Sequence, residues 1–282
     1  MLKTGQVKSE LARAKINLTL HVGRVIKDPH DSFFGYHPLD SLVVFADIGD
    51  HISMSPCDET SLTIEGPFGA ALSAGDDNLI LKALRAAKAA PHNIKLEKNL
   101  PVSAGIGGGS ANAAAVLRLC GSEDPKTAIS LGADVPVCLA SQTAHMTGIG
   151  EDVSLIADMG RFNALLINPG VAVSTGAIFK AFDSAPNIRE TPRPLLPKGD
   201  LLTRAIDGRN DLEPIAIKQA PVIGEVLRTL ASQNGCQLAR MSGSGATCFG
   251  IFETKADEAR AANAIKKLEP NWWLAPVLLG EA

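Results

Sequence analysis

A regular polarity pattern runs from Leu11 to Val22, where apolar and polar residues alternate almost perfectly. The apolar positions are Ala12, Ala14, Ile16, Leu18, Leu20 and Val22, and the polar ones are Arg13, Lys15, Asn17, Thr19 and His21. Because side chains alternate across a strand, this period of two predicts a β-strand with two distinct faces. The polar face is either solvated or part of a functional site.

The rest of the pattern predicts an α+β protein. Strands are expected at 39–45, 51–54, 62–64, 94–100, 163–168, 238–241, 248–252 and 273–279, and helices at 78–90, 111–119, 125–131, 211–220, 222–234 and 256–267. Gly49 and Asp50 predict a turn between the first two of these strands. The proline-rich stretch 184–200 predicts an extended loop. A change of composition near 155–162 predicts two domains, 1–158 and 159–282.

Composition narrows the class of protein. The chain has 282 residues, 45% of them hydrophobic and 20% charged, which is typical of a globular protein. A net charge of −3 argues against a nucleic-acid partner. The pattern contains no apolar run long enough for a membrane helix and no secretory signal. Five scattered cysteines and six histidines without paired metal-ligand spacing indicate reduced thiols, a cytoplasmic location and no metal site built from protein ligands alone.

The strongest local signal is a glycine-rich segment, Pro101-Val-Ser-Ala-Gly-Ile-Gly-Gly-Gly-Ser-Ala111, followed by a stretch of helix formers. We expect Ser110 to cap a helix over 111–119. Free N–H groups and the positive end of the helix dipole would then favour a phosphate chain. No lysine follows the glycines, as a Walker loop requires, and Ser110 replaces the third glycine of the dinucleotide fingerprint. The alternative is a glycine-rich surface turn.

Seven motifs in a fixed order carry a family resemblance. They are Ala14-Lys-Ile-Asn17, Gly35-Tyr-His37, Asp77-Asn-Leu-Ile80, the Gly105–Ser110 loop, Gly132-Ala-Asp-Val-Pro136, Asn168-Pro-Gly170 and Ser242-Gly-Ser-Gly245. Together they resemble the GHMP kinases, over roughly residues 11–280. The resemblance implies a ribosomal-S5-like N-terminal ATP-binding domain and a ferredoxin-like C-terminal α/β domain.

Within the superfamily, the motifs are most similar to kinases that use ATP to phosphorylate the 2-hydroxyl of a cytidine-diphosphate ester of methylerythritol. That reaction belongs to the non-mevalonate route to isoprenoid precursors. Two alternatives remain open. One is a related kinase acting on homoserine or mevalonate, and the other is a non-catalytic nucleotide-binding protein of the same fold.

The resemblance assigns nucleotide-binding roles. The ATP phosphates, with Mg²⁺ bridging their oxygens, would lie against the backbone of Pro101, Val102, Ser103, Ala104, Gly105, Ile106, Gly107, Gly108, Gly109, Ser110 and Ala111. Asn78 and Lys98 would lie near the adenine. For Lys98, a solvated lysine at the end of a strand is the alternative.

The resemblance also assigns the chemistry. Asp134 would accept the proton of the substrate hydroxyl, and Lys15 would keep that aspartate ionised and stabilise developing negative charge. The alternative for Asp134 is a helix N-cap, which its position before Val-Pro suits. Asn17 shares the strand face of Lys15 and would bind the polyol or the diphosphate of the substrate.

A cytosine site is implied by the aromatic residues. Tyr36 would stack on one face of the base and Phe179 on the other, while His37 reads the edge of the base. Core packing is the alternative for Phe179. Thr175 would add a polar contact. The second glycine loop, Ser242, Gly243, Ser244 and Gly245, would direct N–H groups to the transferred phosphate.

Three departures from the family pattern stand out. The segment between His21 and Gly35 is long, Ser103 and Ala104 stand where glycine is common, and the connection 121–130 is short. We expect the first to reshape the substrate rim and the second to stiffen the start of the phosphate loop. None removes a catalytic group.

Overall fold

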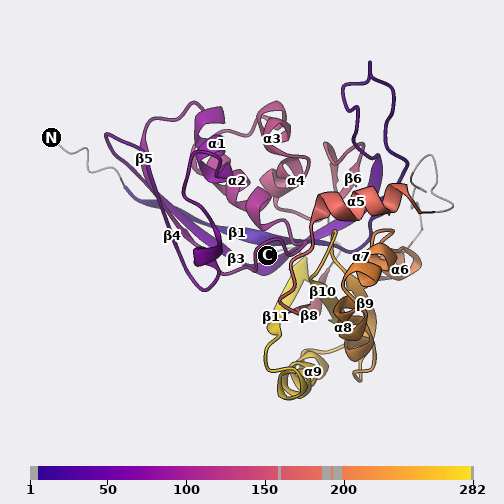
Figure 1. Ribbon diagram of the computed structural model, residues 1–282. Helices are drawn as coiled ribbons and strands as arrows, with labels where there is room; N and C mark the ends of the chain where they lie inside the picture. Colours follow the sequence, from indigo (N-terminus) through magenta and orange to yellow (C-terminus); the bar gives the residue numbers. More distant parts are fainter. Residues whose placement is uncertain (1–5, 158–159, 186–191, 193–198, 281–282) are drawn as a thin grey trace. The chain divides into compact units, whose positions relative to one another are not determined.

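The computed structural model describes residues 6–157, 160–185, 192 and 199–280 (Figure 1). It divides into two compact units, unit 1 (1–15, 48–102 and 107–141) and unit 2 (16–47, 103–106 and 142–282). Strands β1 (Lys8–Asn17) and β3 (Leu39–Pro56) each contribute to both units. The units are therefore not continuous along the chain, and the predicted domain boundary at 158/159 stays a prediction. Most of the predicted loop 184–200 lies outside the described residues.

Unit 1 is a sheet with helices. Its strand order is β4-β5-β3, with β4 (Ser61–Glu65) parallel to β5 (His92–Glu97) and β5 antiparallel to β3. The helical segments are η1 (Gly69–Ala71), α1 (Leu79–Ala86), α2 (Gly108–Leu119), α3 (Pro125–Leu131) and α4 (Val135–Ala140). Helix α2 contacts α1 and α4, and its residues 111–117 are buried. This burial explains its alanine-rich sequence, because small side chains allow close helix packing.

Unit 2 contains an antiparallel sheet in the order β11-β8-β10-β9. Its elements are β2 (His21–Val22), β6 (Ala144–Thr147), β7 (Asp152–Leu155), β8 (Arg161–Asn168), α5 (Thr175–Asp183), α6 (Leu201–Asp207), α7 (Glu213–Gln219), α8 (Val222–Ala231), β9 (Cys236–Met241), β10 (Cys248–Phe252), α9 (Lys255–Leu268) and β11 (Trp273–Gly280). Numbered from β8, the strand order is 4-1-3-2, with helices in both crossovers. This confirms the expected ferredoxin-like arrangement.

The predicted strand 11–22 is interrupted near its end. The N–H groups of Leu18 and Thr19 both donate to the Leu42 carbonyl, at 2.8 and 3.4 Å, which is a bulge-like irregularity. Leu20 then exchanges hydrogen bonds with Arg209 and Asp211 instead. The polar face is not solvated, because Lys15, Asn17, Thr19 and His21 are all buried. These polar side chains therefore need partners within the protein or from a ligand.

The predicted turn at Gly49 and Asp50 is wrong, because β3 continues through both residues. A Cβ atom at Gly49 would lie 2.2 Å from the Ala12 carbonyl oxygen. Glycine is needed there because β1 approaches closely, and no turn is involved. Asp50 is completely buried and binds backbone N–H groups.

Several helix boundaries differ from expectation. Helix α2 begins at Gly108 with Gly107 as its N-cap, so Ser110 lies inside the helix and the predicted serine cap is wrong. Helix α1 ends at Ala86, well before Pro91. The helices and strands predicted from the pattern did not include β6, β7, α4, α5 and α6. Among the described residues, no helix is long and apolar enough to span a membrane.

Candidate active site

The central feature of unit 1 is an ion pair between Lys15 of β1 and Asp134. Lys15 Nζ lies 2.6 Å from Asp134 Oδ1, with the Lys15 side chain 3% exposed and that of Asp134 39% exposed. Asp134 occupies the N-cap position of α4, yet its side chain makes no capping hydrogen bond. The carboxylate is thus directed to the lysine, with enough exposure to meet a ligand. Burial raises the pKa of the nearby Cys138 thiol to about 12, so this thiol stays protonated.

Gly107, at the start of α2 in unit 1, lies against the same lysine. Gly107 has a φ of +65°, and a Cβ atom there would lie 3.0 Å from Lys15 Cβ. Gly108, Gly109 and Ser110 form the first turn of α2, where backbone N–H groups have no partner within the helix. An anion at this helix end would therefore meet both these N–H groups and the Lys15 ammonium.

Lys98 is buried beneath the start of α2. Its Nζ donates to Asp50 Oδ2 at 2.6 Å, and Asp50 Oδ1 accepts from the N–H groups of Asn99 and Leu100 at 2.8 and 2.9 Å. Burial lowers the pKa of Lys98, while Asp50 opposes this shift. The alternative of a solvated lysine is wrong, because Lys98 is 3% exposed. Its contact with ATP stays a prediction, whereas its link to Asp50 fixes the strand end that precedes the loop.

Asn78 has a structural role in α1. Its Oδ1 accepts from the Ile80 N–H at 3.0 Å, and its Nδ2 donates to the Ser73 carbonyl at 2.7 Å. Asn78 is therefore the N-cap of α1. Contact with the adenine stays a prediction.

In unit 2, the second glycine loop packs against the middle of the first. Ser242 Oγ donates to the Gly105 carbonyl at 3.0 Å, and a Cβ atom at Gly105 would lie 2.4 Å from the Ser242 carbonyl oxygen. Within the loop, Gly245 N–H donates to Ser242 O and Ser242 N–H donates to Thr247 O. These two N–H groups are already used, so the predicted phosphate contact concerns Gly243 and Ser244.

Ser103 has a φ of +52° in the first glycine loop. The left-handed region disfavours a residue with a Cβ atom. Stiffening of the loop by this residue stays a prediction.

The candidate cytosine residues also lie in unit 2. Tyr36 is 51% exposed, and the rings of His37 and Phe179 pack in a tilted arrangement at a centroid distance of 4.9 Å, with 34° between their planes. His37 Nδ1 donates to the Gly23 carbonyl at 3.0 Å, which orients the ring. Phe179 packs against the buried core of unit 2 without being fully buried itself. Thr175 Oγ1 lies 2.8 Å from Ser244 Oγ. Stacking of Tyr36 and Phe179 on a base stays a prediction.

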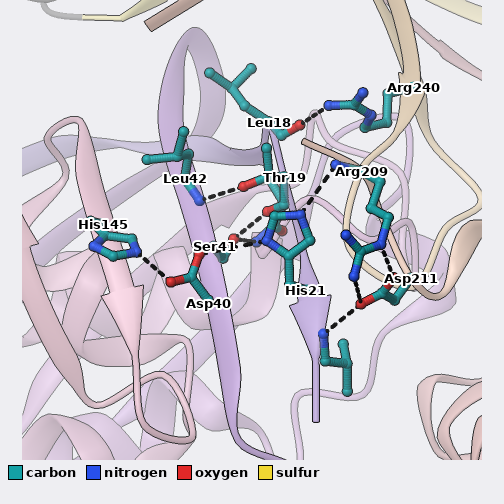
Figure 2. Close-up of polar contacts among 12 residues, drawn as sticks. Leu18, Thr19, His21, Asp40, Ser41, Leu42, His145, Arg209, Asp211 and Arg240 are labelled. Carbon is teal, nitrogen blue, oxygen red and sulfur yellow. Dashed lines mark hydrogen bonds and ion pairs between the residues drawn. The ribbon is translucent and has the colours of Figure 1, made fainter. Parts of the chain in front are cut away.

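The structure contains a buried carboxylate between two histidines, which the sequence analysis did not predict. Figure 2 shows Asp40 of β3 between His145 of β6 and His21 of β2. Asp40 Oδ2 accepts from His145 Nε2 at 2.9 Å, and Asp40 Oδ1 lies 3.6 Å from His21 Nδ1. The Arg209 N–H donates to His21 Nε2, so the remaining ring proton is on the nitrogen that faces Asp40. The only signal in the sequence was the polar face of the first strand.

This cluster predicts a pH-dependent contribution to stability. Burial alone would raise the pKa of Asp40, but the hydrogen bond and charge of His145, together with the His21 N–H that faces the carboxylate, outweigh it and lower the pKa from 3.8 to about 2. Because the folded-state pKa is the lower one, the stabilisation is present above about pH 3.8 and is lost as the pH falls toward 2. It amounts to roughly 2 kcal/mol. Asp40→Asn should remove it.

Urea unfolding of wild type and Asp40→Asn between pH 3 and pH 7 measures this contribution. The difference in unfolding free energy should be largest above about pH 4 and should narrow at lower pH. His145→Ala should lose part of the same pH-dependent difference. A difference that stays constant across this range would contradict the assignment.

Comparison with known proteins identifies the protein family to which this chain is similar. Residues 78–142 match the family model described as GHMP kinases N terminal domain, and residues 193–271 match GHMP kinases C terminal. The Dinoroseobacter shibae protein named 4-diphosphocytidyl-2-C-methyl-D-erythritol kinase is 47% identical over 275 residues, covering 95% of this chain and 93% of its own. The Paracoccus denitrificans protein of the same name is 48% identical over 273 residues, covering 95% of each.

A solved structure agrees with these relatives. The crystal structure of 4-(cytidine 5′-diphospho)-2C-methyl-D-erythritol kinase matches with a TM-score of 0.76 and 30% identity, covering 98% of this chain and 100% of the other. The chain belongs to the 4-diphosphocytidyl-2-C-methyl-D-erythritol kinase family of GHMP kinases.

Proposed function

We propose that this protein uses ATP to phosphorylate the 2-hydroxyl of 4-diphosphocytidyl-2-C-methyl-D-erythritol, in a cytoplasmic pathway to isoprenoid precursors. The observation that carries the proposal is the ion pair of Lys15 and Asp134. Asp134 sits at a helix start without capping it, and its carboxylate is held by a buried ammonium. A protein that only binds nucleotides has no need for this pair. Two relatives carry the name of this kinase, and the similarity extends over nearly their whole length.

In the proposed reaction, the oxygen of the substrate hydroxyl attacks the γ-phosphorus of ATP. The bond between that phosphorus and the β–γ bridging oxygen breaks, and ADP leaves with the electron pair. Asp134 accepts the hydroxyl proton as the oxygen attacks. Lys15 keeps Asp134 ionised and stabilises the negative charge that develops near it. Since an ordinary aspartate is a weak base near pH 7, alignment of the hydroxyl supplies much of the effect.

The first turn of α2 fits a phosphate chain. A Cβ atom at Gly109 would meet nothing within 4 Å, and Gly107 takes a left-handed conformation that brings the helix start close to Lys15. The N–H groups of Gly108, Gly109 and Ser110 would hold the phosphates. Mg²⁺ enters the proposal with the nucleotide and would neutralise phosphate charge. All five cysteines are free thiols, which suits a reducing compartment.

A coupled assay of ADP release tests the proposed substrate. We expect turnover with the cytidine diphosphate compound and little with homoserine or mevalonate. Turnover of either small alcohol in preference to the cytidine compound would favour a related kinase. Absence of turnover with all three would favour a nucleotide-binding protein.

Tyr36→Ala should weaken binding of the cytidine compound by about 1–3 kcal/mol, the value of one base–aromatic stack, or roughly 5- to 150-fold. The Tyr36 N–H and carbonyl are bound to Phe33 and Ile26, so truncating the exposed ring leaves the loop backbone intact. ATP binding should change little. Replacing cytosine by uracil should also weaken binding, because the exocyclic 4-amino donor of cytosine becomes a carbonyl acceptor. Isothermal titration calorimetry measures each effect.

Phe34→Ala is the matched control for the stacking prediction. Phe34 is exposed to a similar degree, at 57%, and lies in the same loop. Its removal should leave the affinity for the cytidine compound unchanged. Equal losses from both variants would mean that the loop, and not a stack on Tyr36, governs binding.

A further inference from the structure

A chain of buried hydrogen bonds determines which way the Asn17 amide faces. Asn17 Nδ2 donates to Ser41 Oγ at 2.8 Å, and Ser41 Oγ lies 2.5 Å from the Thr19 carbonyl oxygen. Asn17 is 3% exposed, and Ser41 and Thr19 are completely buried. Figure 2 shows Ser41 next to Asp40 on β3, facing Thr19.

The directions of these bonds follow from the groups involved. A carbonyl oxygen only accepts, so the single Ser41 hydroxyl proton is donated to Thr19. The Ser41 oxygen can then only accept from Asn17, which requires the NH₂ group of the amide to face it. Thr19 is itself anchored, because its Oγ1 accepts from the Leu42 N–H at 2.9 Å. The Asn17 amide is therefore held in one of its two orientations.

The opposite end of this amide lacks a partner. Asn17 Oδ1 is buried without a hydrogen bond among the described residues. A buried acceptor that stays unpaired is costly, so this oxygen calls for a donor. A hydroxyl carries a donor proton, whereas a diphosphate at neutral pH offers only acceptors. The orientation therefore selects the polyol part of the substrate rather than its diphosphate.

We infer that Ser41 is a positioning residue, which orients Asn17 so that Oδ1 accepts a hydrogen bond from a substrate hydroxyl other than the one that is phosphorylated. This inference rests on the proposed function. The attacking hydroxyl has one proton, which goes to Asp134, so it has none for Asn17. Since position 4 of the methylerythritol is esterified, the donor is the 1- or the 3-hydroxyl. Ser41 thus contributes to specificity without touching the substrate.

Steady-state kinetics with the parent compound and its 1-deoxy and 3-deoxy analogues test this inference. Wild type should prefer the parent over one analogue by roughly 5- to 150-fold in kcat/KM, the effect of leaving one buried acceptor unpaired. Asn17→Ala should abolish that preference. Ser41→Ala should weaken it and lower kcat/KM for the parent about 2- to 12-fold, with KM for ATP unchanged. Ser41→Thr, which keeps the hydroxyl, should retain it.

A double-mutant cycle separates positioning from a general structural effect. Adding Ser41→Ala to Asn17→Ala should change kcat/KM no further, because Ser41 acts through Asn17. Thr247→Val is the matched control, since it removes a buried bond of the same kind, from Asn168 Nδ2 to Thr247 Oγ1 at 2.9 Å. This control should lower stability but keep the preference between parent and analogue. Additive effects of Ser41→Ala and Asn17→Ala, or a full preference in Ser41→Ala, would overturn the inference.

The NMR signal of the Asn17 side-chain amide provides a readout that does not depend on activity. In protein labelled with ¹⁵N-asparagine, this signal is identified by its absence in Asn17→Ala. Its protons should exchange slowly with solvent in wild type and about 2- to 12-fold faster in Ser41→Ala, since net loss of one hydrogen bond has this magnitude. Unchanged exchange would overturn the role of Ser41 even in an active enzyme. If wild type shows no turnover but its Asn17 amide protons exchange slowly, the proposed function is rejected, while the conclusion that Ser41 orients Asn17 stands.

Discussion

Asp134→Asn should lower kcat by a factor on the order of 10²–10⁴, the range for losing a positioned acid–base group. Asparagine keeps the shape of the side chain and can still contact Lys15, but it cannot accept the hydroxyl proton. KM for ATP should change little, because Asp134 lies outside the phosphate loop. Rapid-quench kinetics with saturating ATP and cytidine compound separate the chemical step from product release.

Asp124→Asn is the matched control for this prediction. Asp124 is also an N-cap aspartate in unit 1, but its side chain does cap α3, by accepting from the Lys126 and Thr127 N–H groups. Asparagine caps almost as well, so activity should be retained. An Asp134→Asn enzyme that keeps most of its turnover would remove Asp134 from the role of base.

Gly107→Val should raise KM for ATP sharply and also lower kcat. The left-handed conformation at φ +65° disfavours a β-branched residue, and the new Cβ atom would lie 3.0 Å from Lys15 Cβ and 3.3 Å from Lys15 Cε. Strain and overpacking together cost about 2–5 kcal/mol. The lysine that holds Asp134 is displaced as well as the phosphate loop. Steady-state kinetics with each substrate varied in turn measures both effects.

Gly121→Val is the matched control, because it introduces the same backbone strain at a position outside the phosphate loop. Gly121 has a φ of +72° just after α2, and a Cβ atom there meets nothing within 4 Å. This variant should lose stability but keep KM for ATP. Affinity for the cytidine compound should fall much less than that for ATP in Gly107→Val. Equal losses for both ligands would indicate a misfolded protein or a wrongly assigned loop.

The sequence predicted those parts of the fold that local patterns encode. Alternation along 11–22 predicted both faces of β1, and the strand 248–252 was predicted with its observed bounds. Gly49 was misread because glycine serves two purposes, turns and close backbone approach, and only the neighbouring strand distinguishes them. The serine cap at Ser110 failed for a related reason, since the left-handed Gly107 already begins α2. Length alone does not explain the missed elements, because α3 has seven residues, like the missed α6, and was predicted with its observed bounds.

In the candidate site too, the contacts between distant residues could not be predicted from local sequence patterns. Lys15 and Asp134 are far apart in sequence, so their pairing came from the family resemblance and not from any local pattern. The cluster around Asp40 joins three strands, and the orientation of Asn17 depends on a hydroxyl in another strand. Such contacts arise from tertiary packing, which a single sequence does not encode locally.

The position of the transferred phosphate is the most direct test of the central claim. Carbon 2 of the methylerythritol carries a methyl group and no hydrogen, whereas carbons 1 and 3 carry two and one. ³¹P NMR of the product formed with ATP should therefore show a new phosphate monoester without three-bond coupling to hydrogen. A triplet or a doublet would place the phosphate on the 1- or the 3-hydroxyl, and absence of any new monoester would contradict the kinase activity itself.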